Sequence, residues 1–247
     1  MPRGVNLYDE ANLQQRLWTP AVLIPSVWLD ASDLSTVTIT STGVSEWRHK
    51  TGNGVAVTNA TTTKQPAYVA SALNELGGID FYADKALRYS ASVTVRFACV
   101  VTKSRLSTWY SFHAHLDNTN GSSRIGGLRS AGNTGFHTDT SPGAVWEDGI
   151  SKTVSTSGFS TITNPHIIGW NVPGARGNPA SGVTIGNYDT GNNGGSGVEF
   201  ETIALPYVPS TAQRQAIEGY LAWKWWGAAN TLSADHPFLN RPPMIGD

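Results

Sequence analysis

Glu199 and Glu201 are separated by one residue in a β-forming run over 198–205. On an extended strand, residues i and i+2 point to the same face and lie roughly 7 Å apart. Two carboxyl groups at such a separation can act together in glycoside hydrolysis, one as acid and the other as nucleophile or base. The pair is therefore a candidate catalytic site, and two ordinary strand carboxylates are the alternative.

A second candidate site lies in the alternating stretch 109–117, where polar side chains share one strand face. Two imidazoles and a carboxylate could bind zinc or another transition metal, but no further ligand group stands at a telling spacing. An aromatic ring beside hydrogen-bonding groups suits a sugar. We therefore interpret the face as a glycan-contact surface formed by Trp109, His113, His115 and Asp117.

Other reactive motifs are missing from the sequence. The glycine-rich stretch 191–197 is not a phosphate loop, because no Lys-Ser/Thr pair follows it. No nucleophile-elbow pattern surrounds any serine. The single Cys99 cannot form an intrachain disulfide and is interpreted as a small buried hydrophobe. We expect no catalytic residues, no metal ligands and no resident cofactor.

The elements that must position these groups are mainly strands. Short runs of β-branched and aromatic residues recur from Val27 onward, separated by glycine-rich turns. The clearest alternation covers 93–101, whose odd-numbered residues should share one face. Asp148-Gly149 suits the tight turn of a hairpin over 144–150. The other expected strands are 37–40, 44–47, 55–58, 67–69, 166–170, 183–186 and 198–205.

One strong helix is expected over 210–226. Ser210 and Gln213 form a capping-box pattern, and apolar residues such as Ile217 and Leu221 then recur at helical spacing. Gly227 is expected to end the helix. Many antiparallel strands and one amphipathic helix predict an all-β, two-sheet sandwich, with the helix packed on an outer flank or across an open edge.

Residues 1–24 differ from the rest, and we separate them as an N-terminal arm from a domain over 25–247. Polar and apolar residues alternate over 9–18, which predicts a short amphipathic turn or helix before Pro20 and Pro25 interrupt it. Exposed apolar side chains on such an arm need cover. Either the arm folds onto its own sandwich, or it docks into a partner assembly through Leu7, Tyr8, Leu13, Leu17 and Trp18.

Composition narrows the function classes. The chain has 247 residues, a formal net charge of −1 and no basic cluster, so nucleic acid is not an expected partner. No apolar run approaches the roughly 18 residues of a membrane span. The N-terminus lacks the charged and apolar segments of a secretory signal, and one cysteine fits folding in a reducing cytosol.

Two blocks of sequence carry a family likeness. The first begins with Val-Trp-Leu-Asp-Ala-Ser-Asp over 27–33 and continues through 44–48, 51–54 and 65–69. The second covers 212–225, ending in Gly-Tyr-Leu-Ala-Trp-Lys-Trp, and is followed by Leu-Ser-Ala-Asp-His-Pro-Phe over 232–238. Together they resemble the concanavalin A-like (laminin G-like) jelly-roll domains of tailed-bacteriophage structural proteins.

The resemblance implies an antiparallel jelly roll and a non-enzymatic virion or surface role, often with glycan contact. It also makes calcium the metal to consider, with Asp117, Asn118, Asn120 or Asp189 as oxygen ligands, although none forms a complete loop signature. Laminarinase-like enzymes share the fold but carry a third acid beside their pair. Here Phe200 separates the glutamates and Thr202-Ile203-Ala204 follows, which disfavours hydrolysis.

The leading hypothesis is a bacteriophage virion surface protein, made in the host cytoplasm, that decorates a capsid or tail scaffold through its N-terminal arm. A symmetric scaffold would place it as a homo-oligomer, of which a trimer is one form. The second hypothesis is a glycan-binding module that contacts host-surface polysaccharide, and the third is a glycosidase that uses Glu199 and Glu201.

Overall fold

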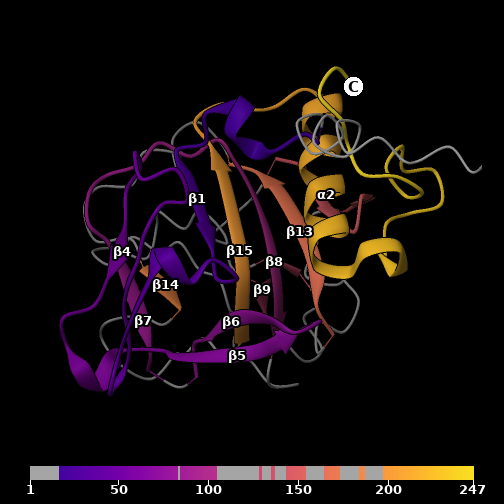
Figure 1. Ribbon diagram of the computed structural model, residues 1–247. Helices are drawn as coiled ribbons and strands as arrows, with labels where there is room; N and C mark the ends of the chain where they lie inside the picture. The colour runs from indigo at the N-terminus through magenta and orange to yellow at the C-terminus, as the bar shows by residue number, and fades with distance from the viewer. Residues whose placement is uncertain are drawn as a thin grey trace, which may run out of the picture.

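The computed structural model describes residues 17–82, 84–104, 128–129, 135–136, 143–153, 164–172, 184–186 and 197–247 (Figure 1). Strands dominate this part of the chain. They are β1 (Val27–Asp30), β2 (Val37–Thr40), β3 (Gly43–Trp47), β4 (Val57–Thr58), β5 (Ala67–Leu73), β6 (Leu76–Asp80), β7 (Ala86–Tyr89), β8 (Phe97–Ser104), β9 (Leu128–Arg129), β10 (Gly135–Phe136), β11 (Val145–Glu147), β12 (Ile150–Lys152), β13 (His166–Asn171), β14 (Thr184–Gly186) and β15 (Gly197–Leu205).

Two antiparallel sheets form the body of the fold. The large sheet has the order β12-β11-β13-β8-β15-β6-β5, and β1 also pairs with β15. The small sheet has the order β14-β7-β4-β3-β2, while β9 and β10 form a separate two-stranded pair. This confirms a mostly-β chain with two antiparallel sheets and a C-terminal helix.

The first core lies between the two sheets. Trp47 on β3 and Leu87 on β7 face Val100 on β8 and Ala204 on β15, and all four are almost fully buried. Leu29 on β1 joins them from the edge of β15. Alternate residues of each strand therefore supply this core, as the period of two requires.

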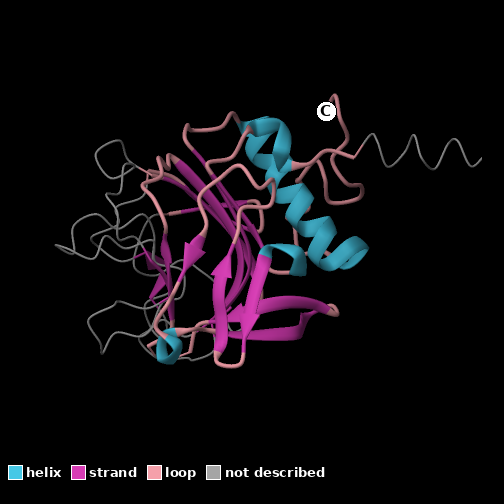
Figure 2. Cartoon of the chain, turned by 60° about the vertical axis from the view of Figure 1, so that its left-hand side comes forward, coloured by secondary structure: helices cyan, strands magenta, loops and turns pink. Residues whose placement is uncertain are grey.

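The second core lies between the large sheet and helix α2 (Thr211–Trp226), which covers the sheet's outer face (Figures 1 and 2). Phe97 and Cys99 on β8 pack with Phe200 on β15 and with Leu221 and Trp225 on the helix. The described elements therefore form three layers: helix, large sheet and small sheet. β15 is buried along its whole length because it is covered on both faces.

The helix begins and ends where its sequence predicts. The Ser210 hydroxyl accepts from the Gln213 backbone N–H, and the Gln213 side chain accepts from the Ser210 N–H, so the capping box is complete. Gly227 caps the other end with φ 60°. The helix packs on the outer flank of the large sheet rather than across an open edge. The expected turn is also confirmed, because Asp148 and Gly149 have φ of 50° and 81°.

Two expectations from the pattern are wrong. The alternation over 93–101 predicts one continuous face, but β8 begins only at Phe97. Val93 and Val95 belong to the core between the sheets, whereas Phe97 belongs to the core under the helix. The expected strand over 55–58 shortens to Val57–Thr58. In both places backbone pairing with neighbouring strands decides the limits, and local pattern does not.

Candidate functional site

Glu199 and Glu201 do not form a shared acid–base site, and the prediction that they share a face is wrong. The register between β15 and β8 shifts between these residues, so Phe200 is the extra residue of a β-bulge. Glu199 lies opposite Thr102 and accepts a short hydrogen bond from the Thr202 hydroxyl inside the sandwich. Glu201 points to the opposite face of the sheet, under the helix, and both carboxyls are buried.

Glu201 is instead the centre of a buried polar network. Its Oε1 accepts from Trp28 Nε1 at 2.8 Å and from the Tyr220 hydroxyl at 3.1 Å. Its Oε2 accepts from Trp225 Nε1 at 2.8 Å and lies 2.6 Å from Lys224 Nζ. Four donors from β1 and α2 therefore converge on one carboxyl with no exposed surface.

Asp30 is the second fully buried carboxyl of this network. It pairs with Glu201 across β1 and β15, and its Oδ2 lies 2.6 Å from the same Lys224 Nζ. Lys50 Nζ lies 2.5 Å from Asp30 Oδ2 and 3.0 Å from Asp33 Oδ2. Two ammonium groups thus neutralise two buried carboxylates, which burial alone would make very costly.

The two carboxyls differ in their protonation equilibria. Burial raises the pKa of Glu201, and the nearby Asp30 charge adds to this, against the opposing effect of Lys224. Burial would also raise the pKa of Asp30, but Lys224, Lys50 and a hydrogen bond from Ser32 outweigh it and lower that pKa. Asp30 is therefore the ionised member, while Glu201 is the member that holds a proton more readily.

This network explains what the two family-like blocks do physically. Trp28 and Asp30 come from the first block, and Tyr220, Lys224 and Trp225 come from the second. Their side chains meet between β1, β15 and the helix, and fix the helix against the large sheet. Glu201 lies in neither block, and only tertiary structure shows that it joins them.

The predicted glycan-contact residues Trp109, His113, His115 and Asp117 lie outside the described residues. So do the calcium candidates Asn118, Asn120 and Asp189, and the docking residues Leu7, Tyr8 and Leu13. The predicted amphipathic segment over 9–18 is described only from residue 17. Within the described ranges, no group of three or more His, Cys, Asp or Glu side chains could hold a metal ion.

Leu17 and Trp18, the two described docking candidates, lie against the C-terminal tail. Leu17 forms an isolated β-bridge with Met244, and the Trp18 N–H donates to Pro243 O at 3.0 Å. The Trp18 ring packs edge-on against Tyr220 of the helix, with centroids 6.4 Å apart. Leu17 remains 43% exposed. The two ends of the described chain therefore lie side by side.

An exposed apolar ledge follows this junction. We define it as Val22, Ile24 and Val208, of which Ile24 is 81% exposed. The Tyr207 hydroxyl donates to Leu23 O at 3.0 Å, which joins the residue before Val208 to the short helix η1 (Pro20–Leu23). Ile24 has φ 51°, a left-handed conformation that is unfavourable for a β-branched residue. Sequence pattern gave no sign of this strained position.

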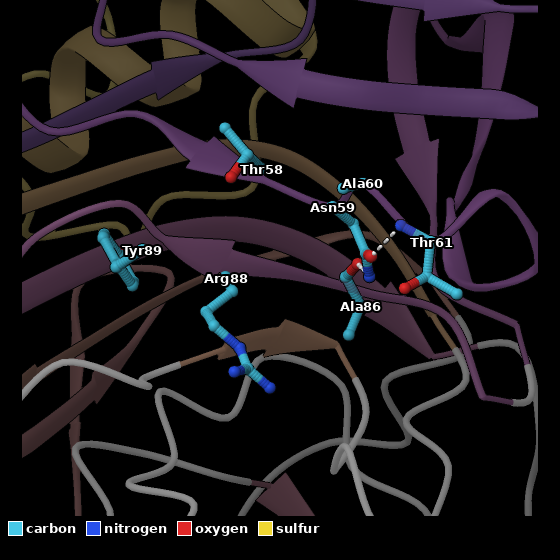
Figure 3. A pocket seen from close by; sticks show the side chains of 7 residues that line it. All are labelled: Thr58, Asn59, Ala60, Thr61, Ala86, Arg88 and Tyr89. Carbon is cyan, nitrogen blue, oxygen red and sulfur yellow. Dashed lines mark hydrogen bonds between the residues drawn. The ribbon is translucent and has the colours of Figure 1, made fainter.

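A pocket of about 270 Å³ opens on the small sheet (Figure 3). Thr58 and Arg88 are cross-strand partners, and their strand neighbours Val57 and Tyr89 face the core. Thr58 and Arg88 therefore point to the outer face, away from the helix. The pocket is lined by Thr58, Asn59, Ala60, Thr61, Ala86, Arg88 and Tyr89. Asn59 Nδ2 donates to Ala86 O at 2.7 Å, which fixes the amide at the rim.

A second polar cluster joins the β11–β12 turn to β13. Asp148 Oδ2 lies 2.7 Å from His166 Nδ1, and its Oδ1 accepts from the Ile167 N–H at 2.9 Å. Burial alone would lower the pKa of His166, but the Asp148 and Glu147 carboxylates outweigh it and raise that pKa. The cluster therefore ties the turn to β13 through a charge-assisted contact.

No helix in the described part of the chain is long and apolar enough to cross a membrane. No family model, no curated protein and no solved structure matches this chain.

Proposed function

We propose that this chain is a non-enzymatic bacteriophage virion surface protein, a decoration or accessory protein that docks on a capsid or tail scaffold through its N-terminal arm. Its sheets would be arranged as a concanavalin A-like jelly roll. The proposal starts from the two sequence blocks, and the network around Glu201 gives those blocks an architectural role.

One observation carries the docking part of the proposal. The chain enters the described fold at Leu17, beside Met244 near its other end, and the exposed Val22 and Ile24 of the apolar ledge follow shortly after it in the sequence. A module held at one end by an arm needs its free apolar surface at that end. The ledge supplies such a surface, and Ile24 is held there in a strained conformation, as is frequent at binding sites.

The test uses substitutions in the full-length chain. We expect Leu7→Asp with Leu13→Asp, and separately Ile24→Asp, to lower occupancy on purified phage particles at least tenfold, measured by quantitative mass spectrometry. The matched control is Ile39→Asp, because Ile39 is also an exposed β-branched residue, 47% exposed, and lies on β2 of the small sheet. Wild-type occupancy for both docking variants would refute the proposed docking surface.

A second candidate function is glycan binding, favoured by the pocket on the small sheet. Its volume of about 270 Å³ suits a group of about one sugar ring, and hydroxyl, amide and guanidinium groups line it. It opens on the face away from the helix, which a particle-bound module would present outward. A glycan array compared between wild type, Arg88→Ala and the control Lys85→Ala tests it. Binding that Arg88→Ala leaves unchanged would exclude this pocket.

A further inference from the structure

Lys224 occupies an unusual position between two carboxyls. Its Nζ lies 2.6 Å from Glu201 Oε2 and 2.6 Å from Asp30 Oδ2, and both carboxyl side chains have no exposed surface. The rings of Tyr220 and Trp225 lie 5.8 and 5.0 Å from the same Nζ. An amine, an acid and a second carboxylate are therefore fixed together in a mostly aromatic enclosure.

We propose that Lys224 and Glu201 condense to an intramolecular isopeptide bond. The Lys224 Nζ attacks the Glu201 carboxyl carbon, a Cδ–Nζ amide bond forms, and the Cδ–Oε2 bond breaks. Oε2 leaves as water, with one proton from the Glu201 carboxyl and one from the amine. No oxidant, reductant or cofactor is needed to balance the step.

The surrounding residues have the positions that this reaction requires. Trp28 Nε1 and the Tyr220 hydroxyl donate to Glu201 Oε1, so they stabilise the negative charge that develops there during attack. Trp225 Nε1 donates to Oε2, the oxygen that leaves. Asp30, on the other side of the amine, accepts the proton that the ammonium must lose before it attacks.

Protonation and burial also favour the step. Burial raises the pKa of Glu201 toward the protonated acid, which is the electrophilic form, while two lysines keep Asp30 ionised. Condensation replaces a half-buried ammonium and a buried carboxyl by a neutral amide, which removes the cost of holding a charged carboxylate away from water. Fixed proximity of this kind is equivalent to effective concentrations of about 10⁵ M or more.

The bond would join β15 to α2 covalently. The chain has one cysteine and cannot form an intrachain disulfide. An amide between residues 201 and 224 would close a loop that contains most of the helix, and would restrain this loop in the unfolded chain as a disulfide does. Such a crosslink suits a protein exposed on a particle, although its formation requires only the residues around Glu201 and not that function.

The decisive experiment is the intact mass of the full chain under denaturing conditions. We expect wild type to weigh about 18 Da less than its sequence requires, the loss of one water. Fragment spectra should contain a branched peptide that joins Lys224 to Glu201. A wild-type mass equal to the sequence mass overturns the proposal, and a branch at Asp30 overturns the assigned roles.

Variants give an independent check. Glu201→Gln should lose about 17 Da, because ammonia replaces water as the leaving group, and misfolding cannot produce that loss. Lys224→Met should show its full sequence mass, whereas the exposed-pair control Lys64→Met should keep the wild-type loss. A Glu201→Gln chain that folds, shown by its circular dichroism, and keeps its full mass would count against the mechanism.

Discussion

Replacing Lys224 by methionine should destabilise the fold strongly. The substitution keeps the length and apolar stem of the side chain but removes the ammonium that serves Asp30 and Glu201 at 2.6 Å each. Lys50 still neutralises Asp30, so the uncompensated group is Glu201, which has no exposed surface. Its three neutral donors, Trp28, Tyr220 and Trp225, do not supply a charge.

The magnitude follows from removing one partner of a buried ion pair, which costs about 3–5 kcal/mol of the free energy of unfolding. This is a lower bound where the isopeptide bond forms, since the crosslink is lost too. In the variant, Glu201 can escape the penalty by taking up a proton. The penalty is therefore absent below its ordinary pKa of 4.5 and grows as pH rises through the raised folded-state value.

Urea denaturation followed by tryptophan fluorescence measures the change. The matched control is Lys64→Met, whose partner Asp84 is 47% exposed, so this pair should contribute about 1 kcal/mol or less. Adding Glu201→Gln to Lys224→Met should recover most of the buried-charge cost of about 3–5 kcal/mol, because it removes that charge, whereas stability lost with the crosslink is not recovered. A Lys224→Met loss no larger than that of the control would refute the assignment of Glu201 as a buried, lysine-dependent carboxyl.

Three further substitutions test other contacts. Gly219→Ala should lower the free energy of unfolding in urea by about 1–2 kcal/mol, because the new Cβ would lie 2.6 Å from Phe238 Cβ. This clash outweighs the higher helix propensity of alanine. An increase in stability would contradict the close packing of α2 on Phe238. The contact of His166 with Asp148 stabilises the fold fully below pH 6.5, and this stabilisation is lost as pH rises through the raised folded-state pKa of His166. His166→Gln should therefore flatten the pH dependence of Tm in that range. An unchanged pH profile of Tm would contradict this contribution. Ile24→Gly should raise the free energy of unfolding by about 1 kcal/mol, because glycine adopts the positive φ of this position without strain. The same change should lower occupancy on the particle. A decrease in both stability and occupancy would indicate a folding defect instead.

Local elements could be read directly from the sequence. The capping box at Ser210, the glycine at 227 and the Asp148-Gly149 turn depend on contacts within a few residues, and all three are confirmed. Strands were also predictable from short runs of β-branched and aromatic residues, such as 37–40 and 166–170. These features follow from short-range geometry, which is the same whatever the rest of the chain does.

The pairing of strands could not be read in this way. A period of two placed Glu199 and Glu201 on one face, and the bulge at Phe200 places them on opposite faces. The bulge depends on how β15 aligns with β8, a contact between residues about one hundred positions apart. One inserted residue reverses the direction of every later side chain. Alternation alone therefore predicted the wrong face for one of the two glutamates.

The strand that carries Glu199 and Glu201 shows most clearly what the sequence determines and what the tertiary structure decides. The sequence by itself determined that acids stand on this strand and that a capped helix follows it. Tertiary structure decided that Glu201 meets Trp28 and Asp30 from one end of the chain and Lys224 from the other. The physical reason is that a buried charge must find an opposite charge, and only the folded chain brings that partner within reach.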